Sequence, residues 1–235
     1  MAQLTWRRAN ECALLLYLPE PVTPTYPLIC RALLEHCREQ YSASLRDVVP
    51  AYRSLLLVFD NPISDHEGKQ ICHAAQQFLH SHDPQDTPPE ITRHTIEVCY
   101  DESLAPDLAT LAQTHDLSTD QVIAKHSAQS YQVCCLGFIP GFAFLGYVDE
   151  AIATPRHQNP RAKVAAGSVG IAGRQTGIYP ADSPGGWQII GRCPELLYDP
   201  QQELYSRFAI GDEVRFQPIS IDEFHAWQDN EASAS

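Results

Sequence analysis

The sequence predicts an α+β protein built from two domains. Up to residue 100, short apolar runs alternate with stretches whose apolar residues recur at helical spacing. From residue 131 onward, short strand-like runs are separated by turns that contain glycine and proline. Between the two patterns, residues 81–89 form a polar, proline-rich stretch typical of a linker. We therefore expect domains over residues 1–88 and 89–220, followed by a short tail over 221–235 that frays because it has nothing to bury.

The first domain is predicted to follow the order β-α-β-β-α-β, which is that of a ferredoxin-like unit. Apolar spacing predicts helices over Leu28–Arg38 and Gly68–His80. Pro27 suits the first turn of a helix, where its missing amide hydrogen costs nothing. The predicted strands are Ala13–Leu18, Ser44–Pro50 and Ser54–Phe59, and Thr95–Tyr100, which lies beyond the linker, completes the order.

The second domain is predicted to begin with two helices and to continue as an all-β barrel or sandwich. The first helix covers Pro106–Thr114. The second covers Gln121–Ser127, and Ser118 with Gln121 provides the capping box that opens it. The predicted strands are Tyr131–Ile139, Ser168–Ala172, Gly177–Tyr179, Trp187–Gly191, Glu195–Tyr198 and Glu213–Pro218.

The charge and hydropathy patterns exclude two classes of partner. The 235 residues carry a net charge of −13, so the surface as a whole repels nucleic acids and anionic lipids. No apolar run reaches the length that spans a membrane, and the N-terminus lacks the pattern of a signal peptide. We therefore expect a cytoplasmic protein that binds neither nucleic acid nor membrane.

The chain also lacks the standard motifs of metal and nucleotide sites. It has eight cysteines, but none forms a C-x-x-C pair or has a histidine at zinc-binding spacing. We expect reduced, mostly buried thiols and no metal or prosthetic group. Phosphate-loop, G-x-S-x-G and H-E-x-x-H motifs are absent as well.

Residues 136–194 form a continuous run of turn and loop chemistry rich in glycine, proline and arginine. Two Pro-Arg pairs, five residues apart, end in Arg156 and Arg161. A proline stiffens the backbone before each guanidinium, which lowers the entropy lost when it binds a carboxylate or phosphate. We interpret the pair as an anion clamp, to which Lys163 and Arg174 add charge. The alternative is that these cations tie the loops to Asp149, Glu150 or Asp182.

Two short stretches of this run are candidate walls of a pocket. Gln175, Thr176 and Tyr179 place an amide, a hydroxyl and a phenol close together. The stretch Gly185-Gly186-Trp187 is a sharp turn that ends in an aromatic residue, and glycines let backbone amides approach a ligand. A purely structural turn is the alternative for both.

His126 ends the helix that precedes the first predicted strand of the barrel. At a helix C-terminus, a charged histidine is stabilised by the helix dipole, which is the structural interpretation. The functional interpretation is a proton carrier that faces the loop run.

The motifs GFIPGFAFLG, PRHQNPR, AGSVGIAGRQTGIYP and SPGGWQIIGRCP, in this order, resemble the family of the 5-oxoprolinase B subunit (PxpB). This family is also known as the KipI family or the allophanate hydrolase subunit 1 domain. The stretch Val48–Leu55 resembles its N-terminal signature, so the resemblance extends over nearly the whole chain. It implies a ferredoxin-like domain followed by a cyclophilin-like β-barrel.

The resemblance also implies a function. Members of the family cleave 5-oxoproline (pyroglutamate) to L-glutamate with ATP as co-substrate, together with two partners, a KipA-like C subunit plus a LamB/YcsF-like A subunit. Without a nucleotide motif of its own, the chain is expected to be inactive without these partners. Other members inhibit a sensor histidine kinase, and related domains form half of the carboxyltransferase of urea carboxylases. Both activities remain as alternatives.

For the enzyme, the resemblance and the residue chemistry together predict the site. Arg156 and Arg161 would bind the carboxylate of an anionic lactam or a phosphate, and His126 or Tyr179 would move a proton. The other residues expected at the site are Gln175, Thr176, Gly185, Gly186 and Trp187. Tyr147 and Arg174 stand where the family usually has glycine, and they add bulk and charge beside the expected pocket.

Overall fold

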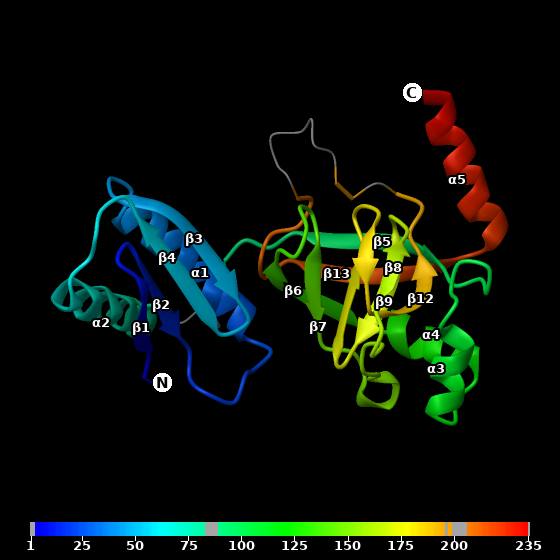
Figure 1. The fold of residues 1–235 in the computed structure, drawn as a ribbon, viewed down its shortest axis with the longest axis horizontal. Coiled ribbons are helices and arrows are strands. Elements are labelled where there is room, and N and C mark those ends of the chain that lie inside the picture. The colour runs from blue at the N-terminus through cyan, green and yellow to red at the C-terminus, as the bar shows by residue number, and fades with distance from the viewer. Residues whose placement is uncertain (1–2, 83–88, 196, 199–205, 235) are drawn as a thin grey trace. The chain divides into compact units, whose positions relative to one another are not determined.

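The computed structural model describes residues 3–82, 89–195, 197–198 and 206–234 (Figure 1). It divides into two compact units, Met1–Ile91 and Thr92–Ser235. Most of the predicted linker, residues 83–88, lies outside the described residues. Among the helices that the structure describes, none is both long enough and apolar enough to cross a membrane.

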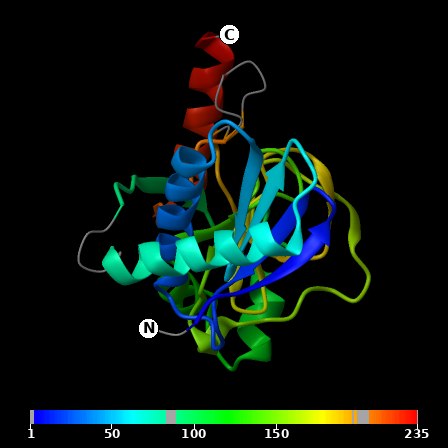
Figure 2. The same cartoon turned by 90° about the vertical axis from the view of Figure 1, so that its left-hand side faces the viewer.

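The first unit is an antiparallel sheet covered by two helices. Its strands lie in the order β1-β2-β4-β3, and each neighbouring pair runs antiparallel. Helix α1 packs on β3 and β4, α2 packs on β1, and the two helices contact each other, so both cover the same face (Figure 2). The elements are β1 (Thr5–Asn10), β2 (Ala13–Tyr17), α1 (Tyr26–Gln40), β3 (Leu45–Ala51), β4 (Ser54–Phe59) and α2 (Asp65–Ser81).

Both predicted helices of this unit are confirmed, but the β-α-β-β-α-β order is wrong at its ends. The strand predicted over Thr95–Tyr100 belongs to the second unit. The edge of the first sheet is instead occupied by β1, at the start of the chain. The residues of β1 are mostly exposed and polar, and an edge strand of this kind lacks the apolar alternation by which strands are found in a sequence.

The second unit is a closed barrel of seven described strands, as the turn-rich pattern predicts. Its strands lie in the order β6-β13-β5-β12-β9-β10-β7, and β7 pairs with β6 to close it. Among the described strand pairs of the barrel, only β13 and β5 run parallel. The strands are β5 (Arg93–Cys99), β6 (Ser130–Leu136), β7 (Ala143–Gly146), β9 (Ser168–Ala172), β10 (Gln175–Ile178), β12 (Gln188–Arg192) and β13 (Glu213–Ile219).

Further elements surround the barrel. Helices α3 (Leu108–Thr114) and α4 (Thr119–Ser127) contact each other, and the capping box predicted at Ser118 is present. A short 3₁₀ helix covers Glu150–Ile152, and β8 (Arg161–Val164) pairs with β11 (Ser183–Gly185) in a separate small sheet. The barrel interior is filled by apolar side chains from alternating strand positions, which include Ile96, Val98, Val133, Val169, Ile171, Val214 and Phe216.

Two predictions for the C-terminal part are wrong. Glu195, Leu197 and Tyr198 are not in a strand, and residue 196 lies outside the described residues. The tail expected to fray forms helix α5 (Ile221–Ala234). The sequence signal for this helix is the capping box of Ser220 and Glu223, in which each side chain bonds the backbone amide of the other residue. Phe224, at 1% exposure, anchors the first turn.

Candidate functional site

A cavity of about 340 Å³ lies in the second unit, beside the loops that follow β6, β10 and β11. Drug-sized ligands are bound in pockets of roughly 300–1,000 Å³, so the space suits a small molecule. The residues that line it come almost entirely from the loop run singled out in the sequence. They are Phe138, Phe142, Phe144, Arg156, Pro160, Tyr179, Pro184, Gly185, Gly186 and Trp187.

The apolar wall of the cavity is a cluster of aromatic rings around Phe142. This side chain is buried, and its ring makes edge-to-face contacts with Phe144, Tyr179 and Trp187 at centroid distances of 4.8, 5.4 and 5.4 Å. Such contacts fix ring orientations and stabilise the cluster beyond simple burial. Phe138 extends the cluster to the surface, where 62% of it is exposed. The wall is therefore rigid at its base and open at its rim.

Arg156 provides the free positive charge of the cavity. It is exposed and forms no hydrogen bond or ion pair with any residue that the structure describes. Three neighbouring cations differ, because each is paired with a carboxylate: Arg161 with Asp107 at 2.6 Å, Lys163 with Asp182 at 2.7 Å and Arg174 with Glu150 at 2.9 Å. The loop-tying alternative is thus correct for Lys163 and Arg174, whereas Arg161 is tied to Asp107, a carboxylate that the alternative did not name.

Asp107 connects two strands that flank the cavity loops, β8 and β12. Its buried carboxylate accepts hydrogen bonds from the Arg161 guanidinium and from the backbone amide of Ile189, both at 2.6 Å. His157 Nε2 lies 3.3 Å from the same carboxylate but has no hydrogen-bond partner among the described residues. The backbone amide of His157 donates to Gly186, which lines the cavity. Asp107 therefore links the start of β8 to β12, close in sequence to Pro160 and Trp187, which line the cavity.

Tyr179 presents its phenol to the same region. Burial raises the pKa of Tyr179, and a hydrogen bond with the Trp187 backbone and the charge of Arg161 partly oppose that shift. The phenol is therefore protonated at neutral pH and able to donate a hydrogen bond. Only glycine fits at position 185, because a Cβ atom there would overlap the Tyr179 hydroxyl.

His126 lies inside the barrel rather than at the cavity. Its Nδ1 accepts from the Tyr100 hydroxyl at 2.8 Å, and its Nε2 donates to Thr176 Oγ1 at 2.9 Å. The Thr176 hydroxyl in turn donates to the Gly170 carbonyl, which assigns the neutral Nε2–H tautomer. Burial lowers the pKa of His126 to about 3. The interpretation of a charged histidine at the helix end is therefore wrong, because the ring is completely buried among apolar side chains.

The structure thus separates the predicted site residues into two groups. Five of them line the cavity, namely Arg156, Tyr179, Gly185, Gly186 and Trp187, whereas Arg161 does not line it and is paired with Asp107. Thr176 and His126 are in the barrel core, and Gln175 begins β10 without lining the cavity. The sequence argument missed the phenylalanines of the GFIPGFAF stretch, whose aromatic spacing was a usable signal. It also missed Asp107, whose partners lie 54 and 82 residues further along the chain.

Tyr147 and Arg174, which depart from the family pattern, do not line the cavity. The Arg174 guanidinium lies over the Tyr147 ring, 5.7 Å from its centroid. The two departures therefore contact each other in a cation–π pair, and they leave the cavity wall unchanged. No group of three or more metal-ligating side chains was found in the described part of the chain.

Comparison with known proteins places this chain in a family. The family model described as carboxyltransferase domain, subdomain C and D, matches residues 4–208. The 5-oxoprolinase B subunit of Bacillus subtilis (strain 168) is 34% identical over 238 aligned residues, which cover 94% of this chain and 95% of that protein. The chain belongs to the PxpB/KipI family of 5-oxoprolinase B subunits. The protein of the same name from Escherichia coli O157:H7 is 47% identical over 130 residues, 55% of this chain and 60% of that protein.

This chain also resembles parts of longer proteins. The crystal structure of TTHA0988 matches with a TM-score of 0.73 and 33% identity, over 92% of this chain and 41% of that one. The urea amidolyase of Saccharomyces cerevisiae is 30% identical over 124 residues, which are 48% of this chain and 6% of that enzyme. The chain therefore corresponds to less than half of these larger proteins.

Proposed function

We propose that this chain is the B subunit of an ATP-dependent 5-oxoprolinase complex that cleaves 5-oxoproline to L-glutamate. The observation that carries the proposal is Arg156, a guanidinium that lies beside a small aromatic cavity and has no partner among the residues the structure describes. Relatives named as the B subunit of 5-oxoprolinase support the choice of substrate. Two further polypeptides complete the enzyme, namely the KipA-like C subunit, which would contact this chain, plus the LamB/YcsF-like A subunit.

In this proposal the cavity recognises the two ends of 5-oxoproline differently. The carboxylate binds the Arg156 guanidinium, whose planar fork matches two carboxylate oxygens. The apolar carbons of the five-membered ring pack against Phe142 and Trp187. The protonated Tyr179 phenol donates a hydrogen bond to the lactam oxygen and positions it for the phosphoryl transfer.

Ring opening needs an activated amide, and ATP supplies the activation. Transfer of the γ-phosphoryl group to the lactam oxygen forms an O-phosphorylated imidate and ADP. Water then adds to the ring carbon, and the C–N bond breaks as the ring nitrogen takes up a proton, which opens the ring to γ-glutamyl phosphate. A second water hydrolyses this acyl phosphate to glutamate and phosphate. Because the sequence holds no nucleotide-binding motif, we assign ATP binding to another polypeptide of the complex or to its interface with this chain.

The decisive experiment reconstitutes the complex and measures glutamate release from 5-oxoproline and ATP. Changing Arg156→Gln is expected to raise KM for 5-oxoproline by about 10- to 100-fold, as for loss of a charge-assisted hydrogen bond. Arg174→Gln is the matched control, since this arginine is already paired with Glu150, and it should leave KM within about twofold. Unchanged KM in Arg156→Gln would contradict the assignment of the cavity.

The dependence on partners is tested with the same components. The chain alone, or with only one partner, is expected to release no glutamate. Activity of the purified chain by itself would refute the division of the active site among several polypeptides.

A second candidate function rests on the likeness to urea amidolyase over about half of the chain. In that case the cavity would form half of a carboxyltransferase site acting on urea or a similar small amide. Such an activity requires a biotin-bearing partner. Biotin-dependent carboxylation of urea by the reconstituted complex, without glutamate release from 5-oxoproline, would favour this alternative.

A further inference from the structure

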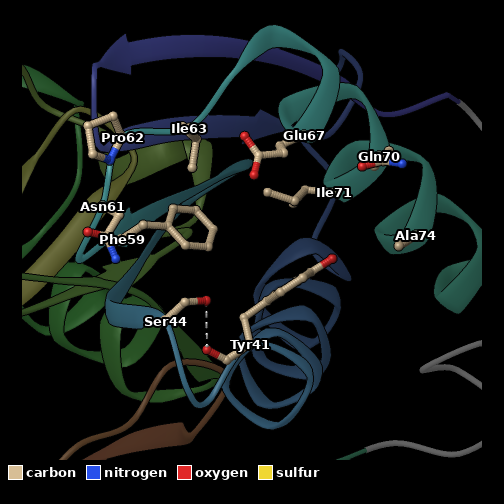
Figure 3. A pocket seen from close by; sticks show the side chains of 10 residues that line it. All are labelled: Tyr41, Ser44, Phe59, Asn61, Pro62, Ile63, Glu67, Gln70, Ile71 and Ala74. Carbon is tan, nitrogen blue, oxygen red and sulfur yellow. Dashed lines mark hydrogen bonds between the residues drawn. The ribbon is translucent and has the colours of Figure 1, made fainter.

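The first unit contains a second cavity, of about 450 Å³, that the proposed function does not use (Figure 3). It lies where the end of α1, the end of β4 and the first turns of α2 meet. Its lining residues are Tyr41, Ser44, Phe59, Asn61, Pro62, Ile63, Glu67, Gln70, Ile71 and Ala74. None of them is a lysine, arginine or histidine.

The base of this cavity is apolar. Phe59, Ile63 and Ile71 are buried and come from β4, the following loop and α2. Tyr41 stands edge-on to Phe59, with ring centroids 6.1 Å apart and an interplanar angle of 75°. Two rings at this angle form a corner into which a third aromatic ring can pack.

The rim of the cavity carries one negative charge in a fixed position. Glu67 Oε2 accepts hydrogen bonds from the Ser64 amide at 2.7 Å and from the Ser64 hydroxyl at 2.6 Å. These bonds lower the pKa of Glu67, so its carboxylate is ionised at neutral pH. The second oxygen, Oε1, has no partner among the described residues, and Figure 3 shows the carboxylate pointing into the hollow towards Phe59.

The phenol of Tyr41 adds a polar group that is also unused. Its hydroxyl forms no hydrogen bond within the part of the chain that the structure describes. The cavity therefore combines an aromatic and aliphatic base, a fixed anion and a free hydroxyl. A bound anion would be repelled by Glu67 and would find no cation in the lining.

We infer that this cavity binds a small primary amine that carries an aromatic body. The ammonium group pairs with Glu67 Oε1, and the ring packs in the corner formed by Tyr41 and Phe59 above Ile71. A lysine side chain of another protein offers the same ammonium on a thin aliphatic stem, which would leave the aromatic corner empty. The site is in a different unit from the cavity assigned to 5-oxoproline and is independent of that assignment.

The test is a titration of the full chain with phenethylamine, followed by calorimetry and by NMR signals of the isoleucine methyl groups. Saturable binding with shifts at Ile63 and Ile71 is expected. 3-Phenylpropionate, which has a similar body and the opposite charge, should bind at least tenfold more weakly. Butylamine, which represents the lysine side chain and has no aromatic ring, should also bind at least tenfold more weakly than phenethylamine. Equal binding of either compound, or no saturable binding of phenethylamine, would overturn the inference.

The substitution Glu67→Gln removes the negative charge but keeps a side chain that can cap helix α2. In this chain Ser118 and Gln121 already form a capping box in which glutamine replaces glutamate. The matched control is Glu223→Gln, because Glu223 makes the same bonds with Ser220 but lines no described cavity. Glu67→Gln should weaken phenethylamine binding by about tenfold, whereas Glu223→Gln should leave it unchanged. The same loss in both variants would refute a specific role of Glu67.

Discussion

The interior of the barrel and the cavity beside it contain similar side chains but use them differently. In the interior, Tyr100, His126 and Thr176 form a chain of hydrogen bonds that ends on a backbone carbonyl. Each donor and acceptor in that chain has a partner, and all three side chains are buried. At the cavity, Arg156 is exposed and has no partner among the described residues.

The difference shows how to distinguish structural polar groups from binding ones. A buried polar group must be satisfied within the protein, since leaving it unpaired costs about 1–3 kcal/mol. An exposed group has water as an alternative partner and can exchange that water for a ligand. The hydrogen bonds among Tyr100, His126 and Thr176 thus stabilise the barrel interior, whereas Arg156 and the aromatic wall of the cavity are available to bind a ligand. Asp107 lies between these cases, because its buried carboxylate supports the wall of the cavity.

The largest effect is expected for Asp107→Ala. This change leaves the Arg161 guanidinium and the Ile189 amide without their partner, and a third of the Arg161 side chain stays accessible to water. We therefore expect a loss of about 3 kcal/mol in the free energy of unfolding, at the low end for a broken buried pair. Urea denaturation measures it. Asp182→Ala, which removes an exposed pair with Lys163 and a hydrogen bond from the Ala166 amide, should lower the free energy of unfolding much less. Similar losses of unfolding free energy in both variants would show that the buried carboxylate of Asp107 stabilises the protein no more than the exposed one of Asp182.

Acid should destabilise the barrel through His126. Folding lowers the pKa of His126 from 6.5 to about 3, so the unfolded chain binds more protons between these values. The free energy of unfolding therefore rises with pH in this window, and His126 alone accounts for a loss of about 2 kcal/mol between pH 7 and pH 5. The ring signals of His126 in NMR spectra should not titrate down to pH 4. A titration midpoint of His126 near pH 6.5 would show that its ring is accessible to solvent and would contradict this prediction.

A smaller effect is expected for Thr176→Val. Valine has nearly the shape of threonine but offers no oxygen to the Nε2–H of His126, which stays buried. We expect a loss of about 1.5 kcal/mol in the free energy of unfolding, with binding of 5-oxoproline unchanged. Thr114→Val is the control, since its hydroxyl bonds a carbonyl at the exposed surface of α3. A change in ligand binding without a loss of stability would place Thr176 in the binding site instead.

Local sequence patterns predicted much of the fold because they depend on neighbours along the chain. Apolar spacing located α1 and α2, and the capping box located α4. The same pattern was overlooked at Ser220, where it begins α5. The strand over Thr95–Tyr100 was found but assigned to the wrong sheet. The alternation of its apolar residues indicates that one face is buried, but it does not indicate which strands lie beside it.

The sequence by itself indicated that the glycine- and arginine-rich loops form the wall of a pocket, and it named five of the residues that line the cavity: Arg156, Tyr179, Gly185, Gly186 and Trp187. Only the tertiary structure decided which arginine is free. Arg156 and Arg161 follow prolines in the same way, but Asp107 pairs with Arg161 across 54 residues of chain. Burial likewise decided the state of His126, because the charge of an imidazole depends on the dielectric and the partners that surround it. Both outcomes depend on contacts between distant segments, which no local pattern encodes.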